Sequence, residues 1–322
     1  MKRRDNVIKP ALIIGSTVAD VTIRLPRLPH TGQDINISSQ SMTLGGCAFN
    51  VSEMLRRFGL PYHLFSPVGS GIYGDFVRSR LREKEIPLLI PCPEEENGCC
   101  YCFVESTGER TFAALHGAEY RFKPQWFDLL DPKELGPVYV CGLELEEDTG
   151  EVILDYLEAN PPKALYFAPG PRIGEIGQEK LERMWNLSPV VHLNGQEAKV
   201  CAEMMARVDG DRTEAPDEDT VQAAQIICRR TGNHVIVTLG ADGALICHRP
   251  GCWRHIPSRP ARQVDANGAG DSHAGTVIAC GMRGMSLEDS VRTANLVAAA
   301  AVEHPGAGLP DEVFDQLKLK FK

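Results

Sequence analysis

Short apolar segments that alternate with helix-length connections constrain the fold of this 322-residue chain more than any other feature. The segments that read as buried strands are Lys9–Ile14, Tyr62–Val68, Leu88–Ile90, Val138–Cys141, Ala164–Phe167, Val190–Leu193 and His234–Leu239. Helical spacing of apolar residues marks connections such as Phe49–Phe58 and Asp75–Lys84. This rhythm is typical of a mostly parallel sheet with helices on both faces. We therefore predict an α/β fold in one continuous domain, residues 1–322.

Two segments interrupt the alternation. Residues 20–44 alternate loosely and contain Pro26, Pro29 and Gly32, which divide them into short strands and turns. Residues 99–113 place two β-like runs on either side of a turn at Ser106–Gly108, as in an antiparallel hairpin. Both segments are predicted to form a small β excursion from the main domain.

Charge and hydropathy exclude several classes of function. The chain has 34 basic and 43 acidic residues, for a formal net charge of -9, and no long basic run, so nucleic acid is not an expected partner. The longest apolar run, Leu296–Val302, is far shorter than the roughly 20 residues of a membrane-spanning helix. The basic start of the chain leads into a strand-like segment without a cleavage-site pattern, which favours a cytoplasmic location.

The eleven cysteines do not suggest a disulfide scaffold, because most lie inside apolar segments. Only two of the three at Cys99–Cys102 share a side of their predicted strand, and no second pair follows. Another group, Cys247, His248, Cys252 and His255, flanks a hairpin-like turn at Pro250 and Gly251. Neither group favours zinc.

The segment Asp265–Gly275 carries the strongest chemical signal. Gly268, Ala269 and Gly270 precede a helix-like run from Asp271 to about Cys280. Glycines let consecutive amides turn toward one point, and the positive end of a helix adds to their attraction for phosphate. A carboxylate normally avoids an anion, so Asp271 is predicted to accept a proton from the group that attacks that phosphate.

A second glycine cluster, Gly45–Asn50, lies between the first β-like segment and a helix. Its glycines permit close approach of a ligand, and Asn50 offers a donor and an acceptor to vicinal hydroxyls. A plain turn with Asn50 near the helix start is the alternative. Asp20 is either a turn residue or a carboxylate that accepts hydrogen bonds from a polyol.

Two motifs follow predicted strands in the second half. Asn194 and Glu197 lie where ligands gather in a parallel sheet, and they suit hydrated magnesium and phosphate or a helix capping box. Both roles are compatible. In Thr238–Ala244, Gly240 and Gly243 form a tight turn that suits either nucleotide contact or a simple hairpin.

A third glycine run, Gly69–Gly74, meets the dinucleotide-binding fingerprint, with Glu94 about twenty residues further along. This predicts an NAD- or FAD-dependent oxidoreductase as an alternative function. The chain has no P-loop motif and no protein-kinase motifs.

Taken in order, Gly45–Asn50, Asn194–Glu197, Thr238–Gly243 and Asp265–Asp271 resemble the motifs of the ribokinase-like (PfkB) family of carbohydrate and nucleoside kinases. The resemblance extends from Gly15 to about Gly308. It implies ATP-dependent phosphorylation of a hydroxyl group of a sugar or nucleoside, with Mg²⁺ and often K⁺. A catalytically idle nucleotide or sugar sensor with the same fold is a third hypothesis, against which the retained Asp271 argues.

The resemblance also assigns roles. Asp271 is the base, and the amides of Gly268, Ala269 and Gly270 form an anion hole. Substrate contacts fall to Asp20, Gly46, Asn50 and Glu144, and nucleotide contacts to Asn194, Glu197, Thr238, Gly240, Gly243 and Asn295. Glu197 would hold Mg²⁺ through water, and Asp265 a monovalent cation. The sequence departs from the family pattern at three places. Ala266 replaces a threonine, His273 replaces a phenylalanine, and the segment Ala168–Arg172 lacks the aspartate that often begins it.

In this family a small β-sheet lid closes over the substrate, and residues 20–44 and 99–113 are where it is expected. Members often pair through their lids. Phe103, Val104 or Phe112 on one exposed face would support such a homodimer here, and a monomer is the alternative. The sequence does not identify the sugar or nucleoside.

Overall fold

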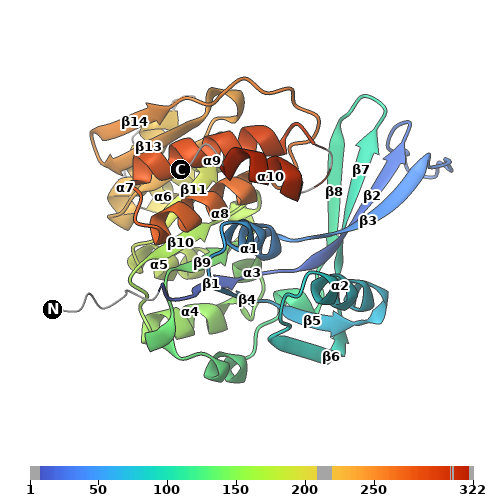
Figure 1. The fold of residues 1–322 in the computed structure, drawn as a ribbon, viewed down its shortest axis with the longest axis horizontal. Coiled ribbons are helices and arrows are strands. Elements are labelled where there is room, and N and C mark those ends of the chain that lie inside the picture. The colour runs from blue at the N-terminus through green and yellow to red at the C-terminus, as the bar shows by residue number, and fades with distance from the viewer. Residues whose placement is uncertain (1–7, 209–219, 305, 307, 319–322) are drawn as a thin grey trace.

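The computed structural model describes residues 8–208, 220–304, 306 and 308–318. Its main element is an eight-stranded sheet that runs across the body of the molecule (Figure 1). The strand order is β14 (Cys252–Ile256), β13 (Ala244–Arg249), β12 (Val235–Thr238), β11 (Val190–Asn194), β10 (Leu165–Ala168), β9 (Val138–Cys141), β1 (Ala11–Ile14) and β4 (Tyr62–Phe65). All neighbours from β4 to β12 are parallel, and β13 and β14 are antiparallel. The predicted mostly parallel sheet is confirmed.

Helices cover both faces of this sheet, as predicted (Figure 1). One face carries α1 (Cys47–Arg57), α8 (Ala269–Met282), α9 (Leu287–Ala301) and α10 (Asp311–Lys318). The other carries α4 (Gly150–Ala159), α5 (Gln178–Asn186), α6 (Gly195–Val208) and α7 (Thr220–Thr231).

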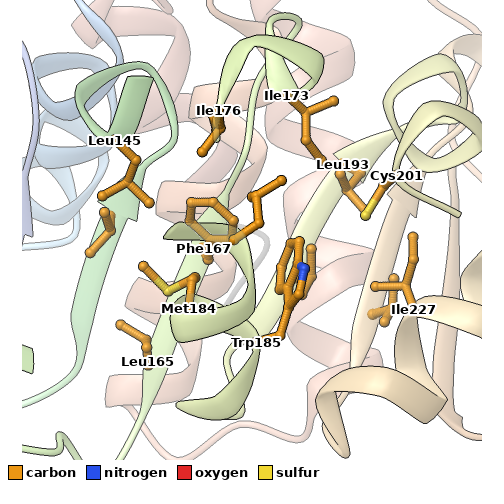
Figure 2. Close-up of a cluster of buried hydrophobic side chains, with 14 of the residues drawn as sticks. Leu145, Leu165, Phe167, Ile173, Ile176, Met184, Trp185, Leu193, Cys201 and Ile227 are labelled. Carbon is orange, nitrogen blue, oxygen red and sulfur yellow. The ribbon is translucent and has the colours of Figure 1, made fainter. Parts of the chain in front are cut away.

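The strands divide their side chains between two cores, since successive residues of a strand point to opposite faces. In β1, Leu12 and Ile14 pack into the core beneath α4–α7, whereas Ala11 and Ile13 pack into the core beneath α1 and α8. Figure 2 shows part of the first core, with Phe167 of β10 near Trp185 of α5. This burial on both faces explains why the strands read as continuous apolar runs.

A separate four-stranded sheet projects from the body (Figure 1). Its order is β3 (Ser39–Gly45), β2 (Val18–Leu25), β7 (Cys99–Glu105) and β8 (Arg110–Leu115), so the two interrupting segments form one small sheet, as predicted. We call this sheet the lid. Its outer face, with Val21 and Tyr101, packs on Tyr73 and Phe76 of α2 (Gly71–Glu83). The opposite face of β2 carries Asp20, Thr22 and Arg24.

One expectation for the lid was wrong. Phe112 is paired with Cys102, and Arg110 with Val104, whereas Phe103 is paired with Thr111. Because neighbouring residues of a strand face opposite ways, Phe103 does not share a face with Val104 and Phe112. Val104 is buried, and Phe112 is exposed.

The segment Tyr62–Val68, predicted as one strand, is two strands in two sheets. β4 ends at Phe65, and β5 (Pro67–Ser70) pairs with β6 (Ile90–Glu96) in a two-stranded sheet. Pro67 lacks the amide that would continue the hydrogen-bond ladder of β4, which accounts for the break.

The glycines at 69–74 have a packing role. A Cβ atom at Gly69 would lie 2.5 Å from the Glu95 carbonyl oxygen, and one at Gly74 would lie 2.1 Å from the Gly69 carbonyl oxygen. This turn joins β5 to α2 outside the large sheet, so it does not belong to a dinucleotide-binding unit of that sheet. The structure therefore gives no support to the oxidoreductase alternative.

The pattern around Pro250 and Gly251 is a hairpin between β13 and β14, as expected. In the part of the chain that the structure describes, no three or more His, Cys, Asp and Glu side chains gather as a metal site. No helix among those residues has the length and apolar character to span a membrane.

Candidate active site

The turn that begins α8, Gly268–Asp271, presents unpaired amides to open space; we call it the glycine turn. Gly268 takes up a left-handed conformation, with φ 68°, and α8 begins at Ala269. Among the described residues, the amides of Gly268, Gly270 and Asp271 have no hydrogen-bond acceptor, whereas Ala269 N donates to Ala266 O over 3.3 Å. A Cβ atom at Gly270 would meet nothing within 4 Å. An anion placed there would meet free amides and the positive end of a 14-residue helix.

Asp271 lies in the first turn of α8 and is partly exposed. The Nδ2 atom of Asn50, from α1, donates to its Oδ2 over 2.9 Å. Burial raises the pKa of Asp271 to about 6, against the hydrogen bonds from Asn50 and Cys47, and the negative charge of Glu197 adds to the rise. Such a carboxyl titrates near neutral pH, which suits a base that must accept a proton.

Asp20 of the lid approaches the same place. Its Oδ2 lies against Gly45, where a Cβ atom would come within 2.0 Å of it. Burial and then the charge of Asp271 raise the pKa of Asp20 to about 7, so the two carboxyls are near neighbours. Gly46 has φ 100° and no room for a side chain, because a Cβ atom would lie 2.5 Å from Ser16 O. The structure therefore brings Asp20, Gly46, Asn50 and Asp271 together.

Glu144 is in a different position. Its side chain is fully buried in the short helix α3 (Leu143–Glu146), and its Oε1 accepts a hydrogen bond from Ser16 N over 2.7 Å. Burial raises its pKa to about 7. The Glu144 carboxyl thus holds the backbone of Ser16, and the carbonyl of Ser16 packs against Gly46. Glu144 therefore acts on the part of the site near Asp20 and Asn50 indirectly, through this backbone segment.

Asn194 and Glu197 form a reciprocal capping box at the start of α6. Asn194 N donates to Glu197 Oε2 over 2.9 Å, and Glu197 N donates to Asn194 Oδ1 over 2.8 Å. The charge of Glu197 also reaches Asp271, as the raised pKa of Asp271 indicates. The cap thus holds one carboxylate near the glycine turn, at the carboxyl end of β11.

A cavity of about 180 Å³ lies on the other side of the glycine turn. Its lining includes four of the six residues to which the family resemblance assigns nucleotide contacts, together with two residues of the glycine turn: Thr238, Gly240, Gly243, Asn295, Ala269 and Gly270. The other two, Asn194 and Glu197, do not line it. Residues from two separate sequence motifs therefore share one pocket with Asn295 of α9, and the glycine turn forms one of its walls.

His273, to which the sequence assigned no role, also lines this cavity. Its Nδ1 lies 2.8 Å from Nε2 of His192, and its Nε2 lies 3.1 Å from Oδ1 of Asn295. Asn295 Nδ2 in turn donates to Ile256 O over 2.8 Å. Burial lowers the pKa of His273 to about 4, so this chain of side chains is neutral at physiological pH. This series of hydrogen bonds fixes the orientation of Asn295. Its residues are distant in the sequence, and the tertiary fold brings them together.

Asp265 precedes the glycine turn and is nearly buried. Its Oδ1 accepts a hydrogen bond from Asn267 N over 2.8 Å, and its Oδ2 accepts one from Gly306 N over 2.8 Å. Arg110 of the lid places Nη1 3.0 Å from the same Oδ1. Sequence reasoning missed Arg110, because the hairpin register that aims it at Asp265 is not evident in the sequence.

Comparison with known proteins decides the family. Residues 9–313 match the family model described as pfkB family carbohydrate kinase. The chain belongs to this family. An uncharacterized sugar kinase of Escherichia coli is 34% identical over 297 residues, which are 92% of this chain and 89% of that protein.

Two solved structures share the fold of this PfkB-family chain. Ribokinase from Thermotoga maritima aligns with a TM-score of 0.79 at 19% identity, over 97% of this chain and 99% of that one. Ribokinase from Cryptococcus neoformans in complex with ADP aligns with a TM-score of 0.77 at 21% identity, over the same shares of the two chains. The predicted ribokinase-like fold is confirmed.

Proposed function

We propose that this protein transfers the γ-phosphoryl group of ATP to a hydroxyl group of a sugar or nucleoside. The observation that carries the proposal is the position of Asp271. It lies beside unpaired amides, with a polar acceptor side formed by Asp20 and Asn50 and a cavity across the glycine turn. A base and an anion site, with polar groups for the acceptor on one side and a cavity for the donor on the other, are what a phosphoryl transfer to an alcohol requires.

ATP is the donor in this proposal. Its adenosine would occupy the cavity lined by Thr238, Gly240, Gly243 and Asn295, with its phosphates directed toward the glycine turn. The ADP complex of the Cryptococcus neoformans relative supports a nucleotide in this fold.

Mg²⁺ fits the remaining donor set. Glu197 holds its carboxylate near Asp271 and is partly exposed, and one carboxylate together with waters and substrate phosphates is a usual set of ligands for Mg²⁺. When bound, the ion would neutralise part of the phosphate charge. Asn194 keeps the Glu197 side chain in place through the capping box.

The acceptor would lie under the lid. Asp20 and Asn50 offer the acceptors and donors that vicinal hydroxyls need, and Gly46 lets the backbone approach the ligand. Glu144 supports this side through Ser16. Asp271 would then accept the proton of the attacking hydroxyl, while the free amides of Gly268 and Gly270 would stabilise charge on the transferring group. A closed lid would exclude water, which otherwise competes for the phosphoryl group.

The direct test is ADP release by the purified protein with ATP, Mg²⁺ and a panel of pentoses, hexoses, sugar acids and nucleosides. The proposal predicts acceptor-dependent ADP release and a phosphorylated acceptor in the mass spectrum. Nucleotide-induced thermal stabilisation without turnover by any acceptor would favour the idle sensor instead. Stabilisation by NAD or FAD but not by ATP would favour the oxidoreductase.

A further inference from the structure

Arg110 connects the lid to the segment that shapes the glycine turn. It is the first residue of β8, and its guanidinium forms an ion pair with the carboxylate of Asp265, which is distant in the sequence. Both side chains are largely shielded, with 21% of Arg110 and 12% of Asp265 exposed. An ion pair with so little solvent is screened much less than a surface pair.

The Asp265 carboxylate accepts hydrogen bonds from the backbone of two separate segments. Asn267, whose amide it binds, immediately precedes Gly268 of the glycine turn, and Gly306 lies beyond the end of α9. A nearly buried carboxylate needs a positive partner in addition to two amides, because taking its charge out of water is costly. Arg110 is the cation that the described residues supply at this carboxylate.

The register of the lid explains why this residue reaches Asp265. Arg110 is paired with Val104, and Val104 with Arg24, four residues beyond Asp20 on the same face of β2. The lid face that holds Asp20 at the acceptor side therefore carries Arg110 above the segment before α8. A cavity of about 160 Å³ separates the two surfaces, with Thr22, Arg24 and Cys102 on one side and Asn267 on the other.

We propose that Arg110 is a positioning residue that the lid delivers to Asp265, where it fixes the glycine turn and takes the place of a monovalent cation. The cation expected from the family resemblance does not fit at Asp265 while Arg110 is in place. The carboxylate oxygens already accept two backbone hydrogen bonds and form an ion pair with Arg110, and a second positive charge would lie within a few ångströms of the guanidinium. Ala266, next in the chain, offers no side-chain oxygen as a ligand. This inference rests on the proposed kinase function for its kinetic consequences, but its structural part does not.

Hydrogen exchange of the ligand-free protein tests the structural part. Arg110→Gln removes the charge and should speed amide exchange at Asn267 and Gly306 severalfold, because both amides donate to Asp265. Arg110→Lys keeps a charge and should restore part of the protection. Arg24→Gln is the matched control, since Arg24 lines the same cavity without a carboxylate partner among the described residues. It should leave exchange at both amides unchanged.

Steady-state kinetics, with the acceptor identified in the panel, test the claim that Arg110 takes the place of a monovalent cation. Turnover of the wild type should be the same within about twofold in potassium, sodium and tetramethylammonium chloride at equal ionic strength. Arg110→Gln should lower kcat by about 10- to 100-fold in tetramethylammonium, as expected for a misplaced catalytic turn, and K⁺ should recover part of the loss. Arg24→Gln should keep the wild-type indifference to the cation, whatever its kcat.

Two results would overturn the proposal. One is unchanged amide exchange in Arg110→Gln, which would show that the ion pair does not hold the turn. The other is a strong requirement of the wild type for K⁺. If no acceptor supports ADP release, the kinase proposal fails, and the exchange experiment still decides the role of Arg110.

Discussion

The pKa values of Asp20 and Asp271, raised to about 7 and about 6, set the expected pH response of the reaction. Asp271 can accept a proton only when it is ionised, so kcat/KM should fall as the pH drops through the range from 7 to 6. Since the two carboxyls interact, the apparent pKa of the acidic limb belongs to the pair. A pH profile from 4 to 9 measures it, and an acidic limb near pH 4 would contradict a base whose pKa is raised by desolvation.

The raised pKa of Asp271 also predicts a cost in stability. A carboxyl with a raised folded-state pKa binds its proton more tightly in the folded protein. Its stabilising effect is therefore complete below the unfolded value of 3.8 and is lost as the pH rises through about 6.

Asp271→Asn should accordingly raise the free energy of unfolding at pH 8 by up to about 3 kcal/mol, at about 1.4 kcal/mol for each pKa unit. Near pH 4 the two proteins should be nearly equally stable. Urea unfolding at both pH values tests this. A variant that is less stable than wild type at pH 8 would show that the carboxylate is not strained by its surroundings.

At the level of single residues, the sequence predicts what glycines and carboxylates imply locally. Asp271 beside a glycine turn and Asn50 at a helix start were both evident from neighbouring residues. The link from His273 to Asn295 and the pair of Arg110 with Asp265 were not, because each joins elements that only the tertiary fold brings together.

At the level of elements, the capping box of α6 should separate stability from catalysis. Asn194→Ala removes a cap and should lower stability by about 1 kcal/mol. Glu197→Gln keeps a side chain that can accept from Asn194 N, so the helix should stay capped.

Catalysis by the Glu197→Gln variant should nonetheless change in two ways. Loss of the carboxylate should raise the Mg²⁺ concentration needed for half-maximal turnover, and it should shift the acidic limb of kcat/KM to lower pH, because the Glu197 charge raises the pKa of Asp271. Unaltered Mg²⁺ and pH dependence in a folded Glu197→Gln protein would confine Glu197 to capping.

The elements themselves were largely predictable, and the misses have physical reasons. The hairpins at 99–113 and 247–255 are encoded by local turn residues, and the structure confirms both. The break between β4 and β5 was missed, since an apolar run does not show that its two halves pair with different strands. The prediction that Phe103 shares a face with Val104 and Phe112 was wrong, because the pairing register of β7 and β8 is not specified by the turn alone.

At the level of the whole molecule, we expect a homodimer formed through the lid. β3 and β8 are the edges of the lid sheet, and Leu115 of β8 is 56% exposed. Exposed apolar residues on an edge strand favour pairing with another chain. Light scattering should give about twice the chain mass, and Leu115→Lys should shift the protein toward monomer. A wild-type monomer at all concentrations would contradict lid pairing.

The measurement that most directly tests the account compares the wild type with Asp271→Asn, using the acceptor identified in the panel. If Asp271 is the base, turnover should fall by about 100- to 10,000-fold while the affinity for ADP, measured by calorimetry, changes little. Equal phosphoryl-transfer rates in the two proteins would contradict the central claim that this carboxylate, held beside the free amides of the glycine turn, activates the acceptor hydroxyl.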